Sequence, residues 1–212
     1  MNMPAFEQGR MKPVLVTPAA LGVVDSMPIS NFVDGQSVYS CGETAGQVYR
    51  VEFGAVRVYR VLANGRRQIL DFHLSGNWFG LQNEDIRRSS AEAIGATAIR
   101  SISLRGARYV WQGLVPVVLE NYSSAQEHQL VIGRQSAVER VAAFLLEMSN
   151  RAGCACKFDL FMPRIDIADY LGLTIETVSR ALTKLKNGNI IRLRGTRGVE
   201  IVNYKALQKL CL

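Results

Sequence analysis

Short apolar runs separated by glycine fill the first half of the chain after an irregular start. Val48–Phe53 and Ala55–Leu62 nearly alternate between apolar and polar residues, and Gly54 separates them. Alternation over runs of this length is typical of half-buried strands. Ala91–Leu104 continues the pattern of short strand-like runs and is expected to supply the last strands of the region. The pattern therefore predicts an antiparallel β domain in which Gly54 divides two strands.

The pair Asn64-Gly65 is the strongest signal for a tight turn in the chain. Asn-Gly flanked by alternating apolar residues favours an antiparallel hairpin, so the preceding run is expected to pair with Gln68–Phe72. Glycines recur about every ten residues here, which is typical of a sandwich or barrel of short strands. We therefore predict a sensor-like antiparallel β-roll at residues 33–106, preceded by an N-terminal arm at residues 1–32.

Helical spacing replaces the glycine pattern beyond Arg105. Pro116 is expected in the first turn of a long helix, and we predict a dimerisation helix over residues 107–137. Its stripe repeats at spacings of three and four, as in a two-helix seam, and comprises Leu119, Tyr122, Gln126, Leu130, Gly133 and Ala137. The same stripe fits an amphipathic helix packed on its own β-roll, so the spacing leaves both alternatives open. A further helix and a linker are expected at residues 138–156.

Two short helical segments joined by a tight turn lie in the C-terminal quarter. Gly172 can take the left-handed conformation that ends a helix, and Thr174 is a good N-cap for the next one. Ala168, four residues before Gly172, is small enough to let the two helices cross closely. This pattern predicts a helix-turn-helix, with helices at Ile165–Leu171 and from Thr174 to about Lys186.

The second of these helices divides into an apolar and a polar face. The expected apolar anchors are Ile175, Val178, Leu182 and Leu185, while Glu176, Ser179, Arg180 and Thr183 recur at helical spacing on the other face. Arginine can bind guanine O6 and N7, glutamate can accept from cytosine N4, and a small hydroxyl fits beside a thymine methyl. The predicted base-reading residues are therefore Glu176, Ser179 and Arg180. Alternatively, Glu176 and Arg180 form only a surface ion pair.

A second hairpin is predicted after this helix, from Ile190–Leu193 and Val199–Asn203. Its tip carries Arg194 and Arg197, which are placed to contact phosphates and so fix register without reading sequence. Because a hairpin after a helix-turn-helix is a wing, residues 157–212 are predicted to be a winged helix-turn-helix DNA-binding domain. The other predicted contacts to the DNA backbone are Thr174, Thr183 and Lys184. Without the neighbouring helix, the tip would be interpreted as a solvated turn.

The basic residues are concentrated in the predicted DNA-binding domain. The chain has a net charge of +7, from 25 basic and 18 acidic residues. Residues 157–212 hold ten of the basic and five of the acidic residues, a local charge of +5. This excess favours a polyanionic partner, above all double-stranded DNA, although a solvated basic surface is an equal alternative on charge alone.

Several classes of protein are excluded by what the sequence lacks. No run reaches the ~18 apolar residues of a membrane span, and the start is broken by prolines and charges, so no signal peptide is expected. Four scattered cysteines are too few for a disulfide framework, and a cytoplasmic protein is therefore expected. The motifs of serine hydrolases, P-loop nucleotidases and zinc proteases are missing, so the chain is not predicted to be an enzyme.

The order of β-roll, long helix and winged helix-turn-helix resembles the Crp-Fnr superfamily of bacterial transcription regulators. The resemblance covers nearly all of the chain beyond about Asn31 and is strongest in IADYLGLTIETVSRALTKL and in the preceding GRQSAVERVAAFLLEM. Glu176-Thr-Val-Ser179-Arg180 matches the E-x-x-S-R signature of the Fnr branch, and the segment is most similar to FixK proteins. The resemblance implies an α+β homodimer that binds TTGAT-N4-ATCAA palindromes and activates transcription by recruiting RNA polymerase. It also implies control of genes for microaerobic and nitrogen metabolism.

The β-roll departs from the cyclic-nucleotide binders of this superfamily. Those proteins carry a glutamate after the F-G of the roll, which holds the ribose hydroxyl, whereas Leu81 follows W-F-G here. The R-R-S triplet that begins at Arg87 resembles their phosphate site, but without the acid an ordinary loop is the favoured interpretation. No cyclic nucleotide is therefore expected as a ligand.

No cofactor and no metal site are predicted. Fnr holds an iron–sulfur cluster through N-terminal cysteines, and this chain has none before Cys41. His73 and His128 are the only histidines, and a lone histidine is more often structural than a haem ligand. Cys154-Ala-Cys156 fits unreactive linker cysteines better than a thiol switch or a weak metal site. The alternative functions are a regulator of this fold gated by haem or another small ligand, and a nucleotide-binding signalling module.

Overall fold

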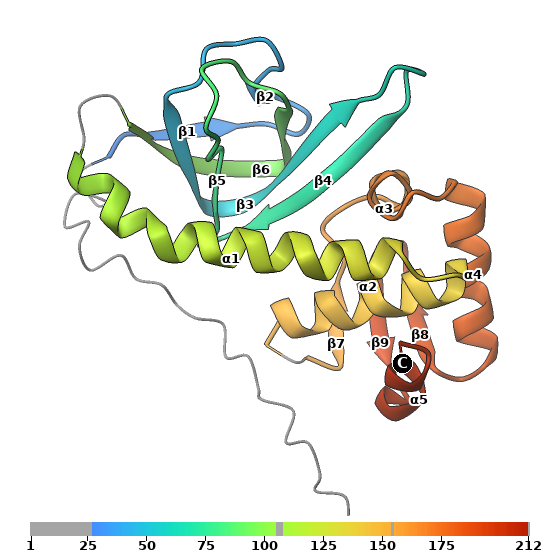
Figure 1. The fold of residues 1–212 in the computed structure, drawn as a ribbon. Coiled ribbons are helices and arrows are strands. Elements are labelled where there is room, and N and C mark those ends of the chain that lie inside the picture. Colours follow the sequence, from blue (N-terminus) through green and yellow to red (C-terminus); the bar gives the residue numbers. More distant parts are fainter. Residues whose placement is uncertain (1–26, 105–107, 154, 212) are drawn as a thin grey trace, which may run out of the picture.

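The computed structural model describes residues 27–104, 108–153 and 155–211, which form a β-sheet unit and a helical unit in contact with each other (Figure 1). The N-terminal unit is an antiparallel sheet of β1 (Ile29–Phe32), β2 (Ser37–Tyr39), β3 (Gln47–Val61), β4 (Arg67–Leu74), β5 (Trp78–Phe79) and β6 (Ser90–Ser103). Its main strands follow the order β1-β6-β3-β4, while β2 pairs with β6 and β5 pairs with β3. The predicted antiparallel β-roll is confirmed.

Strand β3 is one continuous strand where the sequence predicted two. Gly54 lies at an irregularity in the pairing of β3 with β6 and has a φ of +83°, which glycine adopts without steric strain. A Cβ atom at this position would lie 2.5 Å from the carbonyl oxygen of Ala96. Gly54 therefore marks a bulge that bends a long strand and does not end it. In the same way, β6 is one long strand in place of the several expected over residues 91–104.

The predicted hairpin joins β3 to β4. The Leu62 N–H donates to the Arg66 carbonyl at 2.8 Å, and Gly65 has a φ of +78°, so the turn predicted from Asn64-Gly65 is confirmed. At the other edge of the sheet, β1 pairs with β6. The sheet therefore begins before residue 33, and the prediction of an arm that reaches residue 32 is wrong for its last residues. The rest of that predicted arm, up to residue 26, lies outside the described residues.

Helix α1 (Arg108–Ile132) runs along the β-roll and contains Pro116 well inside it, whereas the sequence predicted this proline in the first turn. Leu114 and Val117 are fully buried and share a cluster with Trp78 of the sheet. One face of α1 is therefore occupied within its own chain.

The long helix predicted to reach residue 137 ends at residue 132. Ser136 begins α2 (Ala137–Arg151) with a capping box, in which its hydroxyl accepts from the Glu139 N–H at 3.2 Å. The N-cap residue takes an extended conformation, with φ −101° and ψ 146°, and this prevents one helix from running through. Gly133 consequently lies in the turn and Ala137 opens the next helix, so neither belongs to α1.

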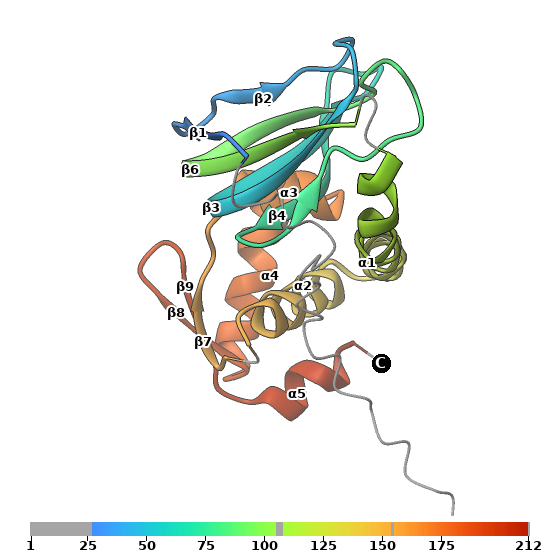
Figure 2. The same ribbon diagram turned by 90° about the vertical axis from the view of Figure 1, so that its left-hand side faces the viewer.

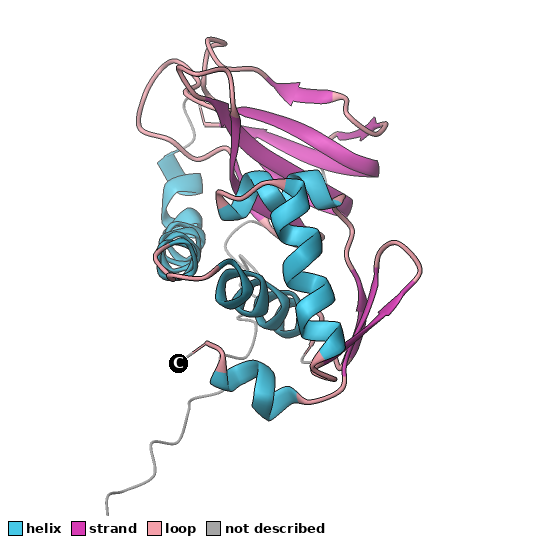
Figure 3. Cartoon of the chain, turned by 90° about the vertical axis from the view of Figure 1, so that its right-hand side faces the viewer, coloured by secondary structure: helices cyan, strands magenta, loops and turns pink. Residues whose placement is uncertain are grey.

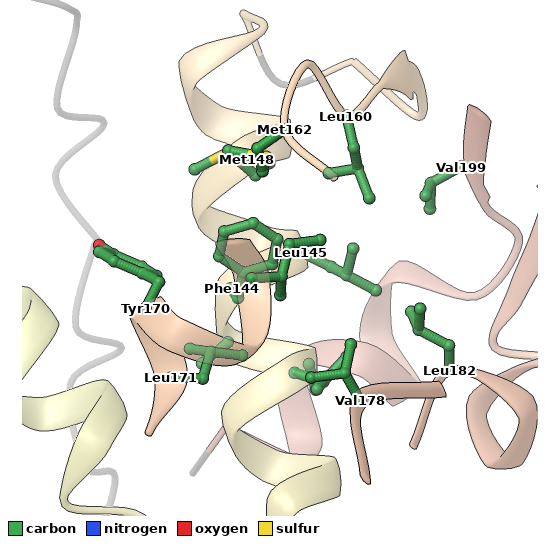
Figure 4. Packing of buried hydrophobic residues seen from close by; sticks show 14 of the residues in the cluster. Phe144, Leu145, Met148, Leu160, Met162, Tyr170, Leu171, Val178, Leu182 and Val199 are labelled. Atoms are coloured by element: carbon green, nitrogen blue, oxygen red, sulfur yellow. The ribbon is translucent and has the colours of Figure 1, made fainter. Parts of the chain in front are cut away.

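The C-terminal unit combines helices with a small sheet. It contains β7 (Lys157–Asp159), α3 (Arg164–Leu171), α4 (Ile175–Asn187), β8 (Ile191–Arg194), β9 (Gly198–Ile201) and α5 (Tyr204–Lys209), with the strands in the order β7-β9-β8. Figure 2 shows β8 and β9 joined in a projecting hairpin, as expected for a wing. Helix α2 packs inside this unit, where Phe144 and Leu145 are fully buried with Leu171 and Val178 (Figure 4).

The β-roll has two apolar faces, and the C-terminal unit covers one of them. Val51, Val56 and Ile99 fill the inside of the roll. Ile69 and Phe72, by contrast, belong to the cluster that includes the core of α2, α3 and α4. Figure 3 shows α3 directly beside the sheet. The two units therefore share a continuous apolar core.

Candidate nucleic-acid interface

The turn between α3 and α4 sets the crossing of the helix-turn-helix. Gly172 has a φ of +65° and a ψ of 36°, which is the left-handed conformation predicted for it. The Leu173 N–H donates to the Ala168 carbonyl at 2.9 Å. Thr174 then caps α4 by accepting from the Thr177 N–H at 3.3 Å. The predicted turn and both of its helices are confirmed.

Helix α4 turns one face to the core and the other to solvent. Val178, Leu182 and Leu185 are buried, as predicted. Ile175 was predicted to be a fourth anchor, but 40% of its surface is exposed. As the first residue of the helix, it lies at the edge of the packed face. Ala181 is buried in addition, so the anchoring face is displaced toward the middle of α4.

The predicted reading face consists of the exposed Glu176, Arg180 and Thr183 and the half-buried Ser179. The Glu176 carboxylate accepts a hydrogen bond from its own backbone N–H and a second one from the hydroxyl of the N-cap Thr174, and both lower its pKa. Its carboxylate is therefore ionised at neutral pH and acts only as an acceptor. In the described part of the chain, Arg180 donates to the Thr177 hydroxyl at 3.4 Å and not to the Glu176 carboxylate. Both charged ends are thus available to a partner.

Arg164, the first residue of α3, was not predicted from the sequence as part of the site. Its guanidinium donates to the Ser179 hydroxyl at 3.4 Å, which places a further positive charge next to the reading face. The available signal was an arginine at the start of the first helix, because the second helix of this motif crosses the first closely.

The wing carries a compact group of charges around Glu200. The Glu200 carboxylate lies 3.0 Å from Arg194, 3.3 Å from Arg192 and 3.5 Å from Lys157. Desolvation raises the pKa of Glu200, but the three cations together lower it by more, and Arg194 has the largest effect among them. Arg197 is exposed and donates to a backbone carbonyl at 3.2 Å. Of the two predicted wing contacts, Arg194 is therefore already paired with a carboxylate, whereas the partner of Arg197 is uncharged.

The remaining predicted backbone contacts lie on the same helix as the reading face. Thr174, Thr183 and Lys184 are all exposed. Figure 3 shows α4 extending away from the sheet, with the β8–β9 hairpin next to its far end. The helix and the wing thus form adjacent parts of one surface.

A stripe of exposed apolar side chains runs along α1 and comprises Val115, Val118, Leu119, Tyr122 and Leu130. The last three were predicted, and each has at least 60% of its surface exposed. Gln126, also predicted, donates to the Tyr122 hydroxyl at 3.0 Å. The two predicted positions outside α1, Gly133 and Ala137, do not continue the stripe, whereas the two valines extend it toward the start of the helix.

A cavity of about 360 Å³ opens in the β-roll, close to the R-R-S triplet. Arg87 of this triplet is buried, and its guanidinium donates to the carbonyls of Gly80 and Gln47 at 2.5 and 2.6 Å. It also stacks on the Tyr39 ring, with the guanidinium carbon 4.3 Å from the ring centre. Leu81 lines the cavity without offering a hydrogen-bond acceptor. Arg88, which directly precedes Ser89 as in the family's Arg-Ser pair, lines the cavity and pairs with Glu84 at 2.5 Å.

Both histidines are packed against aromatic rings. His73 is buried and stacks on Phe79, with ring centres 5.3 Å apart, and His128 stacks on Tyr170 at 3.9 Å. Desolvation lowers the pKa of both, that of His128 to about 4. Among the described residues, no cluster of His, Cys, Asp and Glu is arranged to hold a metal ion. Of the predicted linker cysteines, Cys156 is exposed and Cys154 lies outside the described residues.

A β-roll followed by a winged helix-turn-helix defines the class of DNA-binding transcription regulators with a cyclic-nucleotide-binding-like domain. The cyclic nucleotide-binding domain family matches residues 29–112, and the Crp-like helix-turn-helix domain family matches residues 139–210. No helix among those described is long and apolar enough to cross a bilayer. The chain belongs to the Crp-Fnr family of transcription regulators.

Within this family, the chain is similar to the nitrogen fixation regulation protein FixK of Rhizobium meliloti (strain 1021), with 44% identity over 183 residues that cover 86% of this chain and 87% of the relative. The transcriptional activatory protein AadR of Rhodopseudomonas palustris is 38% identical and covers 81% of this chain, which in turn covers 77% of AadR. The solved structure of FixK2 from Bradyrhizobium japonicum superposes with a TM-score of 0.80 and 38% identity, and covers 88% of this chain and 98% of its own. The protein is therefore a FixK-like regulator and, like these relatives, not an enzyme.

Proposed function

We propose that this protein is a homodimeric transcription activator that reads a TTGAT-N4-ATCAA palindrome through α4. The observation that carries the proposal is the pair of exposed side chains of opposite charge, Glu176 and Arg180, in the first half of a capped helix. Residues near the start of a recognition helix are those that contact base edges. Each half-site contains one G·C pair within TTGA, and this chain has one arginine and one glutamate on the reading face.

Each reading side chain has a distinct chemical role in this proposal. Arg180 binds O6 and N7 of the guanine, Glu176 accepts from N4 of the paired cytosine, and Ser179 lies beside a thymine. Thr174, Thr183 and Lys184 on α4, with Arg194 and Arg197 on the wing, contact phosphates and fix the register of the protein on the duplex.

The apolar stripe on α1 supports a dimer. Five large apolar side chains on one helix face, led by Leu130 at 64% exposure, are more than isolated surface residues. They recur at the spacing of a two-helix seam. A twofold dimer through α1 presents two recognition helices to the two halves of a palindrome, about 34 Å or one DNA turn apart.

The names of the relatives support activation as the outcome of binding. AadR is described as a transcriptional activatory protein, and FixK as a nitrogen fixation regulation protein. We extend this to the present chain as control of genes for microaerobic and nitrogen metabolism, with RNA polymerase as the partner that an activator recruits.

The β-roll is proposed to work without a cyclic nucleotide. A site for cyclic AMP needs an acceptor for the ribose hydroxyl and a free guanidinium for the phosphate. Leu81 offers no acceptor, Arg87 is bound to two carbonyls and the Tyr39 ring, and Arg88 at the cavity is paired with the Glu84 carboxylate. Burying a ligand group without its partner is unfavourable, so calorimetry with cyclic AMP or cyclic GMP is expected to show no micromolar binding.

The function is tested by selecting binding sites from random duplexes with the wild-type protein and two variants. Wild type is expected to select an inverted TTGA repeat. Arg180→Ala should lose about 1–3 kcal/mol per half-site and its preference for the G·C pair. Lys209→Ala removes the same charge from the last turn of α5, outside the reading face, and should leave the consensus unchanged. A consensus without the repeat, or a retained G·C preference in Arg180→Ala, contradicts the proposal.

A further inference from the structure

A buried ionic cluster joins the first helix of the helix-turn-helix to the β-roll. Asp166 in α3 is completely buried, and its carboxylate accepts from Arg57 of β3, at 2.9 Å, and from Arg67 of β4. Asp169, nearly one helical turn later, also pairs with Arg67, at 2.9 Å. Glu92 of β6 holds Arg57 at 2.7 Å. Burying a carboxylate is unfavourable unless it is paired and hydrogen-bonded, so this cluster depends on the contact between the two units.

Strand β4 makes further contacts with the C-terminal unit beside the cluster. The Gln68 amide donates to the Tyr170 carbonyl at 3.3 Å, and the Phe72 ring packs on the Tyr170 ring with centres 5.1 Å apart. Arg151, at the end of α2, donates to the Phe72 carbonyl at 2.6 Å and pairs with Asp71 at 3.4 Å. One strand of the roll thus holds both the first helix of the motif and the helix that precedes it.

The covalent connection between the units is a short turn that contains a glycine. Only residues 133–136 separate α1 from α2, and Gly133 among them is exposed. Because glycine permits a wide range of backbone conformations, noncovalent contacts between the units help to set the angle at which the DNA-binding unit sits. These contacts use α3, so Glu176 and Arg180 on α4 remain exposed while the units are docked.

We propose that the Asp166–Arg57–Arg67 cluster is an interdomain lock that holds α4 in the orientation required for DNA binding. The proposal rests on the DNA-binding function proposed above. A dimer must present two recognition helices at a fixed spacing. If the DNA-binding units pivoted freely about residues 133–136, the binding-competent arrangement would be one of many, and the apparent affinity would fall by the fraction in which it is populated. The lock keeps that fraction high before DNA arrives.

The first test measures operator binding of Asp166→Asn against a matched control. This substitution keeps the size of the side chain but leaves Arg57 and Arg67 without their shared carboxylate. Asp159→Asn makes the same change in charge at an exposed position of β7. Because removing a negative charge from the DNA-binding unit by itself favours DNA binding, the control should bind a TTGAT-N4-ATCAA duplex as tightly as wild type or more tightly. Asp166→Asn should bind at least tenfold more weakly.

A second, milder variant keeps the binding test informative if Asp166→Asn does not fold. Asp169→Asn removes only the more accessible ion pair with Arg67, so it is expected to fold and to lose a smaller part of the affinity. If Asp166→Asn unfolds, Asp169→Asn carries the test, and affinity equal to wild type in that variant contradicts the lock.

The second test measures the orientation itself. Cys41 on the roll and Cys156 next to β7 are both exposed and accept spin labels in a background with serine at positions 154 and 211. Electron–electron distance measurements, with labelled chains diluted in unlabelled ones, should give a narrow Cys41–Cys156 distribution that broadens in the Asp166→Asn and Asp169→Asn variants. Unchanged distributions refute the lock. Broadening together with tighter DNA binding also refutes the proposal, because the cluster would then be inhibitory. If wild type itself fails to bind the duplex, the proposed function fails, while the distance distributions still test the docking.

Discussion

Protonation of His128 should destabilise the folded protein, and the size of this effect can be worked out from its surroundings. The ring lies half-buried between α1 and the Tyr170 ring of α3, and its Nδ1 atom has no hydrogen-bond partner among the described residues. Desolvation is the largest cause that lowers the pKa of His128, to about 4 from an ordinary value of 6.5. The unfolded chain therefore binds a proton at this site between pH 6.5 and 4, while the folded chain does not.

The sign and the magnitude follow from proton linkage. Because the unfolded state binds more protons in this window, the free energy of unfolding falls as the pH is lowered through it. With these two pKa values, the loss between pH 7.5 and pH 5 is about 2 kcal/mol, and solvent access to the half-buried ring reduces it to about 1–2 kcal/mol. The stability contributed by the neutral ring is fully present above the unfolded pKa.

The assay compares urea denaturation of wild type and His128→Phe at several pH values and one protein concentration, since dimerisation also adds to stability. Phenylalanine keeps a ring against Tyr170, cannot titrate, and removes the unpartnered nitrogen. The stability of the variant relative to wild type should therefore rise by about 1–2 kcal/mol as the pH falls from 7.5 to 5. Gln129→Ala, at an exposed neighbouring position, should follow the wild-type curve. A His128→Phe curve that stays parallel to wild type would refute the reasoning.

Three further outcomes are expected. Gly54→Ala should lower the free energy of unfolding by more than about 2 kcal/mol, measured by denaturation, because its Cβ would lie 2.5 Å from a carbonyl oxygen at a φ of +83°; a near-neutral change would contradict the bulge. Leu130→Glu should produce monomers in sedimentation, whereas Ile86→Glu, at an exposed apolar site of the β-roll, should remain dimeric; a dimeric Leu130→Glu would show that the seam is misplaced. Arg197→Ala should weaken binding to all duplexes alike and reduce the slope of affinity against salt by about one charge; a change in the selected consensus would assign it a base contact.

Local signals predicted the helix-turn-helix well, because its elements depend on neighbours in sequence. Gly172 ends α3, and Thr174 caps α4, through contacts within a few residues. The end of α1 was predicted less well, since the apolar stripe continued in sequence past the point where the capping box at Ser136 begins a new helix. Periodicity shows where apolar residues face one direction but does not show where a helix stops.

The contacts between the two units were not predictable from the sequence. Asp166 and Arg57 are separated by 109 residues, and nothing near either one shows that it is buried. Asp166 would be assigned to a solvated helix start, where acidic residues are common. For the same reason, the continuity of β3 through Gly54 depends on its pairing with the distant strand β6. Pairing between residues far apart in the sequence decides both features, and a single sequence gives little indication of such pairing.

Strand β3 links two regions that differ in purpose. One end, at Tyr49, lies in the aromatic group around the buried Arg87, while the other end carries Arg57, which contacts Asp166 of the DNA-binding unit. Gly54 lies between them as the only left-handed residue of the strand. β3 is therefore one backbone shared by the surroundings of Arg87 and by the contact with α3, and the bend at Gly54 sets the angle between these two ends.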